Sequence, residues 1–102
     1  MGVELALVVT GACGTRLAVR FAELAASHPQ VETLHVVLSD GARFVVADEL
    51  GADRATPAGF VAGLALEPAA RRKVKTWAEA DMNAPIASGS HRLAGVVVLP
   101  CS

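Results

Sequence analysis

Small polar residues follow three apolar runs of this sequence, and they are the residues best suited to hold a ligand. They occupy Thr10 to Gly14, Ser39 to Gly41 and Pro100 to Ser102. Hydroxyl groups, a thiol and the backbone N–H groups of a tight turn are suitable partners for a phosphate monoester. The full glycine pattern of a dinucleotide site is absent, and no acidic residue is placed to bind a ribose diol. The pattern therefore predicts a phosphate site for a mononucleotide.

The first polar segment lies between a predicted strand and a predicted helix. The apolar run Leu5–Val9 is short, ends in β-branched residues and is stopped by a glycine turn, which is typical of a buried strand. Helical spacing follows the turn. Three apolar side chains of that helix are predicted to face the core: Leu17, Phe21 and Leu24. Together these elements form the first half of a βαβ unit, and the alternative is a turn that is tight only for packing.

Further strands and helices alternate along the chain. Strands are predicted at 31–38 and 95–99, with a short one at 74–77. A helix is predicted at 43–50, with Phe44, Ala47 and either Val45 or Leu50 facing inward. Another helix is predicted to begin at Thr56, with Pro57 in its first position. Alternation of this kind indicates a parallel α/β sheet with right-handed crossovers. Ligands of such sheets bind at the carboxyl ends of the strands, so we expect the three polar segments to meet at one edge.

Composition limits the class of protein. The 102 residues suffice for one small domain, and a formal net charge of −1 argues against general nucleic-acid binding. No apolar stretch reaches the roughly 18 residues of a membrane span. Two cysteines fit a reducing cytoplasm, and the histidines lack metal-ligand spacing, so no metal is expected. His35, inside an apolar run, is predicted to be a packed strand residue, and Arg71 to Lys73 a solvated turn.

Four short motifs occur in order along the chain: TGACG after the first strand, LSDGAR after the second, APIASGS, and the closing GVVVLPCS. Together they resemble the flavin prenyltransferase (UbiX) family, part of a wider group of FMN-binding flavoproteins that includes the cysteine decarboxylases. The resemblance extends from Leu5 to Ser102 and covers about the N-terminal half of a typical member. It implies a Rossmann-like (flavodoxin-like) parallel sheet with flanking helices, in truncated form.

The resemblance implies an enzyme that joins a dimethylallyl group from dimethylallyl phosphate to reduced FMN. The product, prenylated FMN, would serve a partner decarboxylase, and the family forms homo-oligomers, commonly dodecamers. We expect a cytoplasmic protein with no metal, nucleic-acid or membrane partner. Two alternatives stay open: a partial FMN-binding module that does no chemistry, and an FMN-dependent cysteine-type decarboxylase of the related branch.

The resemblance also implies which residues bind the flavin. Gly11, Ala12 and Cys13 match the first flavin-binding loop, where the family usually has serine in place of Cys13. Ser39 matches a serine on the phosphate side of the flavin, although such a residue is more often a plain helix N-cap. Ser102 matches the start of the next phosphate-binding turn.

Four residues are implied to be catalytic: Glu49, Cys13, Ser88 and Ser90. Glu49 matches a glutamate linked to the prenyl-donor site, with acid–base help or phosphate positioning as its role. Taken alone, it would more often be a solvated surface charge. Ser88 and Ser90, with Gly89, match the loop that shapes the flavin and prenyl pocket.

The family's sheet order makes a geometric prediction. The first strand lies next to the strand that ends at Pro100, so Cys13 and Cys101 are expected to be close together as free thiols. The same order leaves the apolar strand at 95–99 on an unprotected edge of the sheet. We therefore expect a further segment or a second chain to cover that edge.

Overall fold

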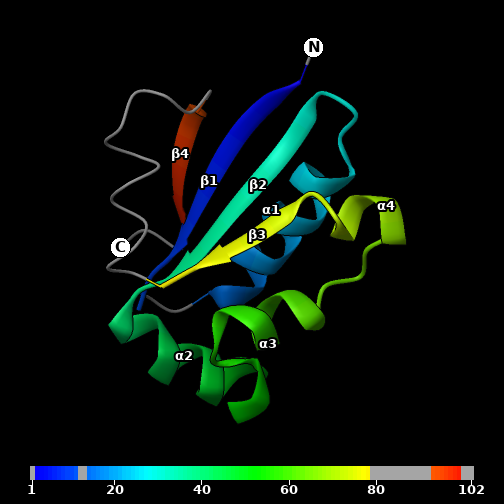
Figure 1. Ribbon diagram of the computed structural model, residues 1–102. Coiled ribbons are helices and arrows are strands. Elements are labelled where there is room, and N and C mark those ends of the chain that lie inside the picture. The colour runs from blue at the N-terminus through cyan, green and yellow to red at the C-terminus, as the bar shows by residue number, and fades with distance from the viewer. Residues whose placement is uncertain (1, 12–13, 79–92, 100–102) are drawn as a thin grey trace.

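The computed structural model of the chain describes residues 2–11, 14–78 and 93–99. These ranges form a four-stranded sheet flanked by helices (Figure 1). The elements in chain order are β1 (Val3–Val9), α1 (Thr15–Ser27), β2 (Val31–Leu38), α2 (Asp40–Leu50), the short 3-10 helix η1 (Ala52–Arg54), α3 (Pro57–Ala62), α4 (Pro68–Arg71), β3 (Val74–Trp77) and β4 (Leu93–Leu99). The predicted α/β fold is confirmed, including the short strand at 74–77.

The strand order is β3-β2-β1-β4, and all three strand pairs are parallel. The chain moves in one direction from β1 to β2 to β3, whereas β4 lies on the other side of β1 (Figure 1). Right-handed crossovers then place α1 and the helices between β2 and β3 on the same face of the sheet. The strand order reverses between β1 and β4, which is the position where open α/β sheets bind ligands.

One face of the sheet carries the main core. Alternate residues of β1 and β2, such as Leu7 and Val36, pack against buried residues from all four α-helices. The core is aliphatic apart from Phe60 of α3, the largest fully buried side chain. Each fully buried Leu, Val or Phe side chain contributes about 1.5–3 kcal/mol. The helices are therefore held to the sheet by many similar contacts.

The predicted core face of α1 was wrong. Leu17 and Leu24 are 58% and 56% exposed, and Phe21 is only partly buried. The buried positions are one residue further along, with Ala18 and Ala22 fully enclosed. Both sets of residues have helical spacing, but small side chains let the helix axis approach the sheet more closely. The helix therefore buries its small alanine face, which packs closely on the sheet, rather than its larger leucine side chains.

The N-cap signal at Ser39 is confirmed, but the predicted start of α2 and its predicted buried face were wrong. Ser39 is the N-cap, and its Oγ accepts a hydrogen bond from the Ala42 N–H at 3.2 Å. Ala42 and Val46 are the buried residues, whereas Phe44 is 81% exposed. The helix begins three residues before the predicted start at 43, so its inward face is set by this earlier cap.

The start predicted for α3 is confirmed. Thr56 is its N-cap, and its Oγ1 accepts from the Gly59 N–H at 3.0 Å, with Pro57 in the first turn. The break before it is also confirmed, because Gly51 follows α2 with a φ of 116°, which favours glycine.

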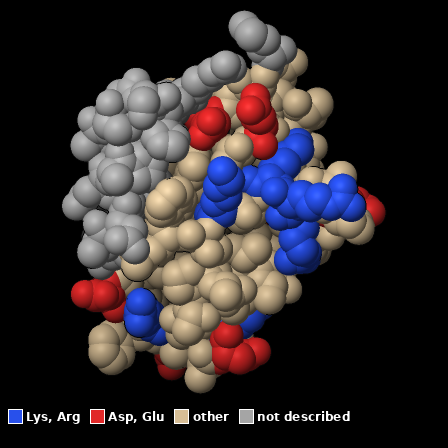
Figure 2. All heavy atoms as spheres, in the orientation of Figure 1, with Lys and Arg blue, Asp and Glu red and all other residues tan. Residues whose placement is uncertain are grey.

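The charged segment after α3 is more ordered than a solvated turn. The Arg71 guanidinium donates to the carbonyl oxygens of Val61 at 2.7 Å and Leu64 at 2.6 Å. Lys73 Nζ donates to the His28 carbonyl at 3.1 Å, and of the run from Arg71 to Lys73 only Arg72 is classed as exposed. Figure 2 shows basic side chains gathered in the region of β3 and α4, with acidic side chains close by. The cluster therefore has a structural role in joining α4 to its neighbours.

Candidate functional site

The carboxyl ends of β1, β2 and β4 meet at one edge of the sheet, which we call the rim. The Thr10 N–H donates to the Leu99 carbonyl at 3.1 Å, and the Ser39 N–H donates to the Val9 carbonyl at 2.9 Å. Thr10 and Ser39, the first residues of two predicted polar segments, are thus each joined by a backbone hydrogen bond to the last residue of a neighbouring strand. Six predicted site residues or neighbours lie outside the described ranges: Ala12, Cys13, Ser88, Ser90, Cys101 and Ser102. The expected approach of the two cysteines therefore stays a prediction.

Two glycines bring the first and second turns of the rim into direct contact. A Cβ atom added to Gly11 would lie 3.0 Å from the carbonyl carbon of Gly41 and 3.1 Å from its oxygen. Such a distance is tighter than side chains normally adopt, so Gly11 is needed for this approach. Backbone rather than side chains therefore forms this contact, and both glycines are exposed.

Ser39 lies between these turns and is half-buried. Its oxygen already accepts from Ala42, as an N-cap should, but a serine hydroxyl can still donate one hydrogen bond. The helix-cap role and the phosphate-binding role predicted for Ser39 are therefore compatible.

Glu49, near the end of α2, reaches across the rim to the start of α1. Its Oε1 accepts from the Thr15 hydroxyl at 2.6 Å and from the Thr15 N–H at 2.9 Å. The Gly14 N–H adds longer contacts of 3.3 and 3.4 Å to the two carboxylate oxygens. Gly14 is the N-cap of α1 and has no side chain to accept from these N–H groups. Glu49 supplies the missing acceptor, which is also favourable for the helix dipole.

This contact corrects the simplest form of the phosphate prediction. The turn was expected to leave its N–H groups available at the start of α1, but those of Gly14 and Thr15 donate to Glu49. A phosphate at that position would have to displace a carboxylate of the same charge sign. Thr15 could not be predicted as a partner of Glu49 from the sequence, because only the fold brings together two residues 34 positions apart.

The hydrogen bonds lower the pKa of Glu49. The Thr15 hydroxyl has the largest effect, followed by the Thr15 N–H, while partial burial acts in the opposite direction. The Gly14 N–H and the positive charge of Arg16 lower the pKa further. Glu49 is consequently ionised at neutral pH, where it can carry negative charge or accept a proton but is not a proton donor.

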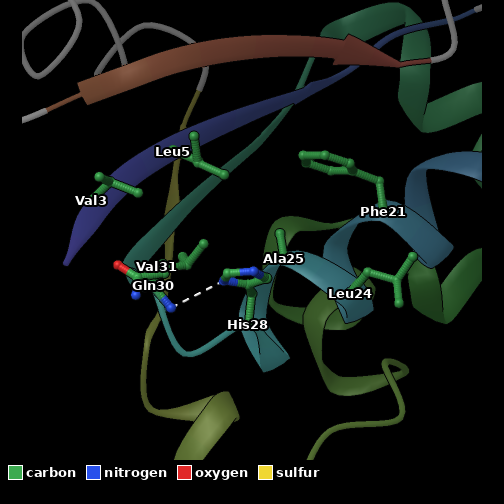
Figure 3. Close-up of a pocket in the computed structure, with 8 residues that line it drawn as sticks. All are labelled: Val3, Leu5, Phe21, Leu24, Ala25, His28, Gln30 and Val31. Carbon is green, nitrogen blue, oxygen red and sulfur yellow. Dashed lines mark hydrogen bonds between the residues drawn. The ribbon is translucent and has the colours of Figure 1, made fainter.

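A separate apolar groove of about 290 Å³ lies away from the rim (Figure 3). It is lined by residues at the amino ends of β1 and β2, including Val3 and Val31, and by Phe21 and Leu24 of α1. The only hydrogen bond drawn there joins the Gln30 N–H to His28 Nδ1 at 3.0 Å. The groove therefore lies at the opposite end of the strands from the predicted phosphate site.

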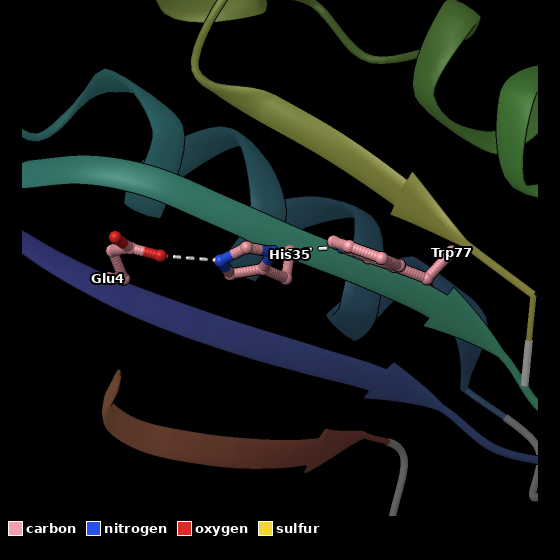
Figure 4. A network of polar contacts seen from close by, with 3 residues as sticks. All are labelled: Glu4, His35 and Trp77. Carbon is pink, nitrogen blue, oxygen red and sulfur yellow. Dashed lines mark hydrogen bonds and ion pairs between the residues drawn. The ribbon is translucent and has the colours of Figure 1, made fainter. Parts of the chain in front are cut away.

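A polar network crosses the face of the sheet opposite the main core (Figure 4). The Trp77 indole N–H donates to His35 Nδ1 at 2.9 Å, and His35 Nε2 lies 2.7 Å from Glu4 Oε1. Since an indole can only donate, the ring proton of His35 is on Nε2 and is donated to Glu4. The predicted burial of His35 is confirmed at 1% exposure. The network itself was missed because it depends on the alignment of three strands.

The described ranges contain no group of three or more His, Cys, Asp or Glu residues able to hold a metal ion. None of the helices in the same part of the chain has the length and apolar character needed to cross a membrane.

The chain is similar to two solved structures of UbiX-like proteins. AnUbiX (PadA1), in complex with FMN and dimethylallyl pyrophosphate, is 26% identical and matches 99% of this chain with a TM-score of 0.65. A dodecameric FMN-dependent UbiX-like decarboxylase from Escherichia coli O157:H7 is 29% identical and matches 96% of it with a TM-score of 0.67. The chain spans 46% of the length of each. No protein-family model and no curated protein sequence matches. The resemblance predicted from the motifs is confirmed by these structures.

Proposed function

We propose that this chain is the FMN-binding portion of a flavin prenyltransferase, which transfers a dimethylallyl group from its phosphate ester to reduced FMN. The observation that carries the proposal is the structural match over nearly the whole chain to AnUbiX, a protein seen with FMN and dimethylallyl pyrophosphate. The rim adds support, because it lies where the strand order reverses, the position at which open α/β sheets bind ligands.

The rim has the donors that an FMN phosphate requires. Gly11 and Ser39 supply exposed backbone and a hydroxyl, and we assign Ala12, Cys13 and Ser102 to the same phosphate and flavin contacts on the strength of the motifs. The start of α1 is a poor place for the phosphate, because Glu49 already binds there. When bound, reduced FMN supplies the nucleophilic N5 and C6 positions that receive the dimethylallyl group.

We assign Glu49 the role of a fixed negative charge in this reaction. In the transfer, the C–O bond of the allyl phosphate breaks and the phosphate leaves with the electron pair, so positive charge develops on the allylic carbon. An ionised carboxylate stabilises that charge and disfavours direct contact with the phosphate. Of the roles predicted for Glu49, proton donation and direct phosphate contact are therefore disfavoured at neutral pH. Cys13, Ser88 and Ser90 are proposed to line the same pocket.

We also propose that the protein works as a cytoplasmic homo-oligomer that passes prenylated FMN to a partner decarboxylase. The similar UbiX-like decarboxylase is a dodecamer, which supports assembly. β4 is an edge strand of the described sheet, and Val96 and Val98 on it are 44% and 42% exposed. An apolar edge of this kind favours association with another chain or segment.

The second candidate function is an FMN-dependent decarboxylase, because one of the similar structures is described as such an enzyme. The two candidates differ in what happens to the flavin. A prenyltransferase starts from reduced FMN and leaves a prenylated flavin. A decarboxylase of the related branch starts from oxidised FMN, which takes two electrons from the cysteine substrate as carbon dioxide is released, and adds no group to the flavin.

The test begins with an FMN titration of the purified chain, followed by flavin absorbance. The bound flavin is then reduced, dimethylallyl phosphate is added, and the flavin is analysed by mass spectrometry. A prenylated flavin is the expected product, and it should not appear with the Glu49→Gln variant. Bound but unmodified FMN would indicate a partial binding module that does no chemistry. Release of carbon dioxide from a cysteine-type carboxylate would indicate the decarboxylase. Failure to bind FMN would overturn the proposal.

A further inference from the structure

We propose that Thr15 is a positioning residue for Glu49: the Thr15 hydroxyl holds the Glu49 carboxylate at the start of α1. The catalytic consequence of this role rests on the proposed function, whereas the contact itself does not. Thr15 is fully buried, and it is the first residue of α1. A fully buried hydroxyl needs a partner, and the partner here is the Oε1 atom of Glu49.

The geometry shows which oxygen is held and by what. The Thr15 hydroxyl and the Thr15 N–H both donate to Oε1, at 2.6 and 2.9 Å. The shorter distance is typical of a hydroxyl that donates to an ionised carboxylate. The Gly14 N–H reaches both oxygens only at 3.3 and 3.4 Å, so it does not distinguish between them. Thr15 therefore sets the orientation of the carboxylate, and Oε2 is the oxygen with fewer constraints.

The hydroxyl can be separated from the helix-capping contact. The two backbone N–H groups satisfy the start of α1 whatever the side chain of residue 15 is. Thr15→Val removes only the hydroxyl and keeps the shape, while Thr15→Ser keeps the hydroxyl. The largest cause of the lowered pKa of Glu49 is this hydroxyl, and Arg16 is the charged group that adds to it. Thr15→Val should therefore raise the pKa of Glu49 without removing the two backbone hydrogen bonds that cap α1.

The first measurement is a carbon NMR titration of the Glu49 carboxyl, which does not depend on activity. In Thr15→Val the pKa of Glu49 should rise towards the ordinary value of about 4.3, and in Thr15→Ser it should stay close to that of the wild type. Thr33→Val is the matched control, because Thr33 is a half-buried strand residue at which valine is well tolerated. Thr15→Ala provides a second hydroxyl-free variant if the valine variant does not fold.

The second measurement compares FMN affinity with the rate of flavin prenylation. Thr15→Val loses one hydrogen bond to a charged group, so its kcat should be about tenfold lower than that of the wild type. Its FMN affinity should change less. Thr15→Ser, which keeps the hydroxyl, should have a kcat close to that of the wild type. An unchanged pKa of Glu49 in both hydroxyl-free variants would overturn the inference even if FMN binds. Equal defects in Thr15→Ser and Thr15→Val would also overturn it. Absence of FMN binding in the wild type would instead contradict the proposed function.

Discussion

Glu49 illustrates what can and cannot be predicted for a single residue. Its place in the site was predicted from a family resemblance, whereas its partner Thr15 was not, because no local pattern links residues 34 positions apart. Ser39 shows the opposite case, since its position before a helix was enough to predict the N-cap. Local signals of this kind are readable from sequence, but contacts between elements require the fold.

The Glu49 contact should make stability depend on pH. The pKa of Glu49 is lowered in the folded state, so its contribution is present above the unfolded value of about 4.3 and is lost as the pH falls through the folded value. Urea unfolding of the wild type should therefore show a loss of stability on acidification that Glu49→Gln lacks. Glu67→Gln is the control, because the Glu67 side chain makes no capping hydrogen bond. The same acid response in wild type and Glu49→Gln would contradict this reading.

The network at His35 should contribute to stability independently of the rim. Trp77→Phe removes the indole donor to His35 Nδ1 while keeping an aromatic ring. Loss of this hydrogen bond in a buried setting should cost about 1–3 kcal/mol in the free energy of unfolding, measured by urea denaturation. A nitrogen NMR spectrum should also show the ring proton of His35 on Nε2. A proton found on Nδ1 instead would be inconsistent with the Trp77 contact.

At the scale of elements, existence and order were more predictable than orientation. The strand at 31–38 was predicted with its observed bounds, and the predicted strands and helices occur in the expected order, although the short helix α4 was predicted to be a charged connection. The inward faces of α1 and α2 were not, because two sets of apolar residues on each helix have the same spacing. Which set packs inward depends on the distance between helix and sheet, and that distance is a property of the assembled core rather than of either helix.

The buried face of α1 can be tested with two variants, one at a buried position and one at an exposed position. Ala22→Leu should destabilise the protein by about 1–3 kcal/mol, because the added atoms have no space between α1 and the sheet. Leu17→Ala should change stability by less than about 0.5 kcal/mol, since Leu17 is 58% exposed. Chemical unfolding of both variants gives the comparison. A larger loss of stability in Leu17→Ala than in Ala22→Leu would support the buried face that was predicted from the sequence.

The contact between the two turns of the rim can be tested with matched glycine variants. Gly11→Ala places a Cβ 3.0 Å from the Gly41 carbonyl carbon, which should force the turns apart and weaken FMN binding by at least tenfold on our account. Gly41→Ala places its Cβ 3.8 Å from the Gly11 Cα, an ordinary contact, and should bind FMN as the wild type does. Equal affinities of the two variants for FMN would show that the close approach has no part in binding.

At the scale of the whole molecule, the chain corresponds to about half of each similar structure. It matches them over 96–99% of its own length and spans 46% of theirs. Much apolar surface is exposed, including Leu24 on α1 and Val96 and Val98 on the edge strand β4. Exposed surface of this kind indicates an interaction with other segments or chains. The extent of assembly could not be predicted from the motifs, because it depends on surfaces rather than on the spacing of residues.

The most direct test of the central claim compares two flavins that differ only in the phosphate. Fluorescence titrations of this chain with FMN and with riboflavin measure whether the rim binds the anionic end of the molecule. We expect FMN to bind and riboflavin to bind at least tenfold more weakly, because charge-assisted hydrogen bonds to the phosphate are lost. Equal affinity for the two flavins, or no binding of either, would contradict the account.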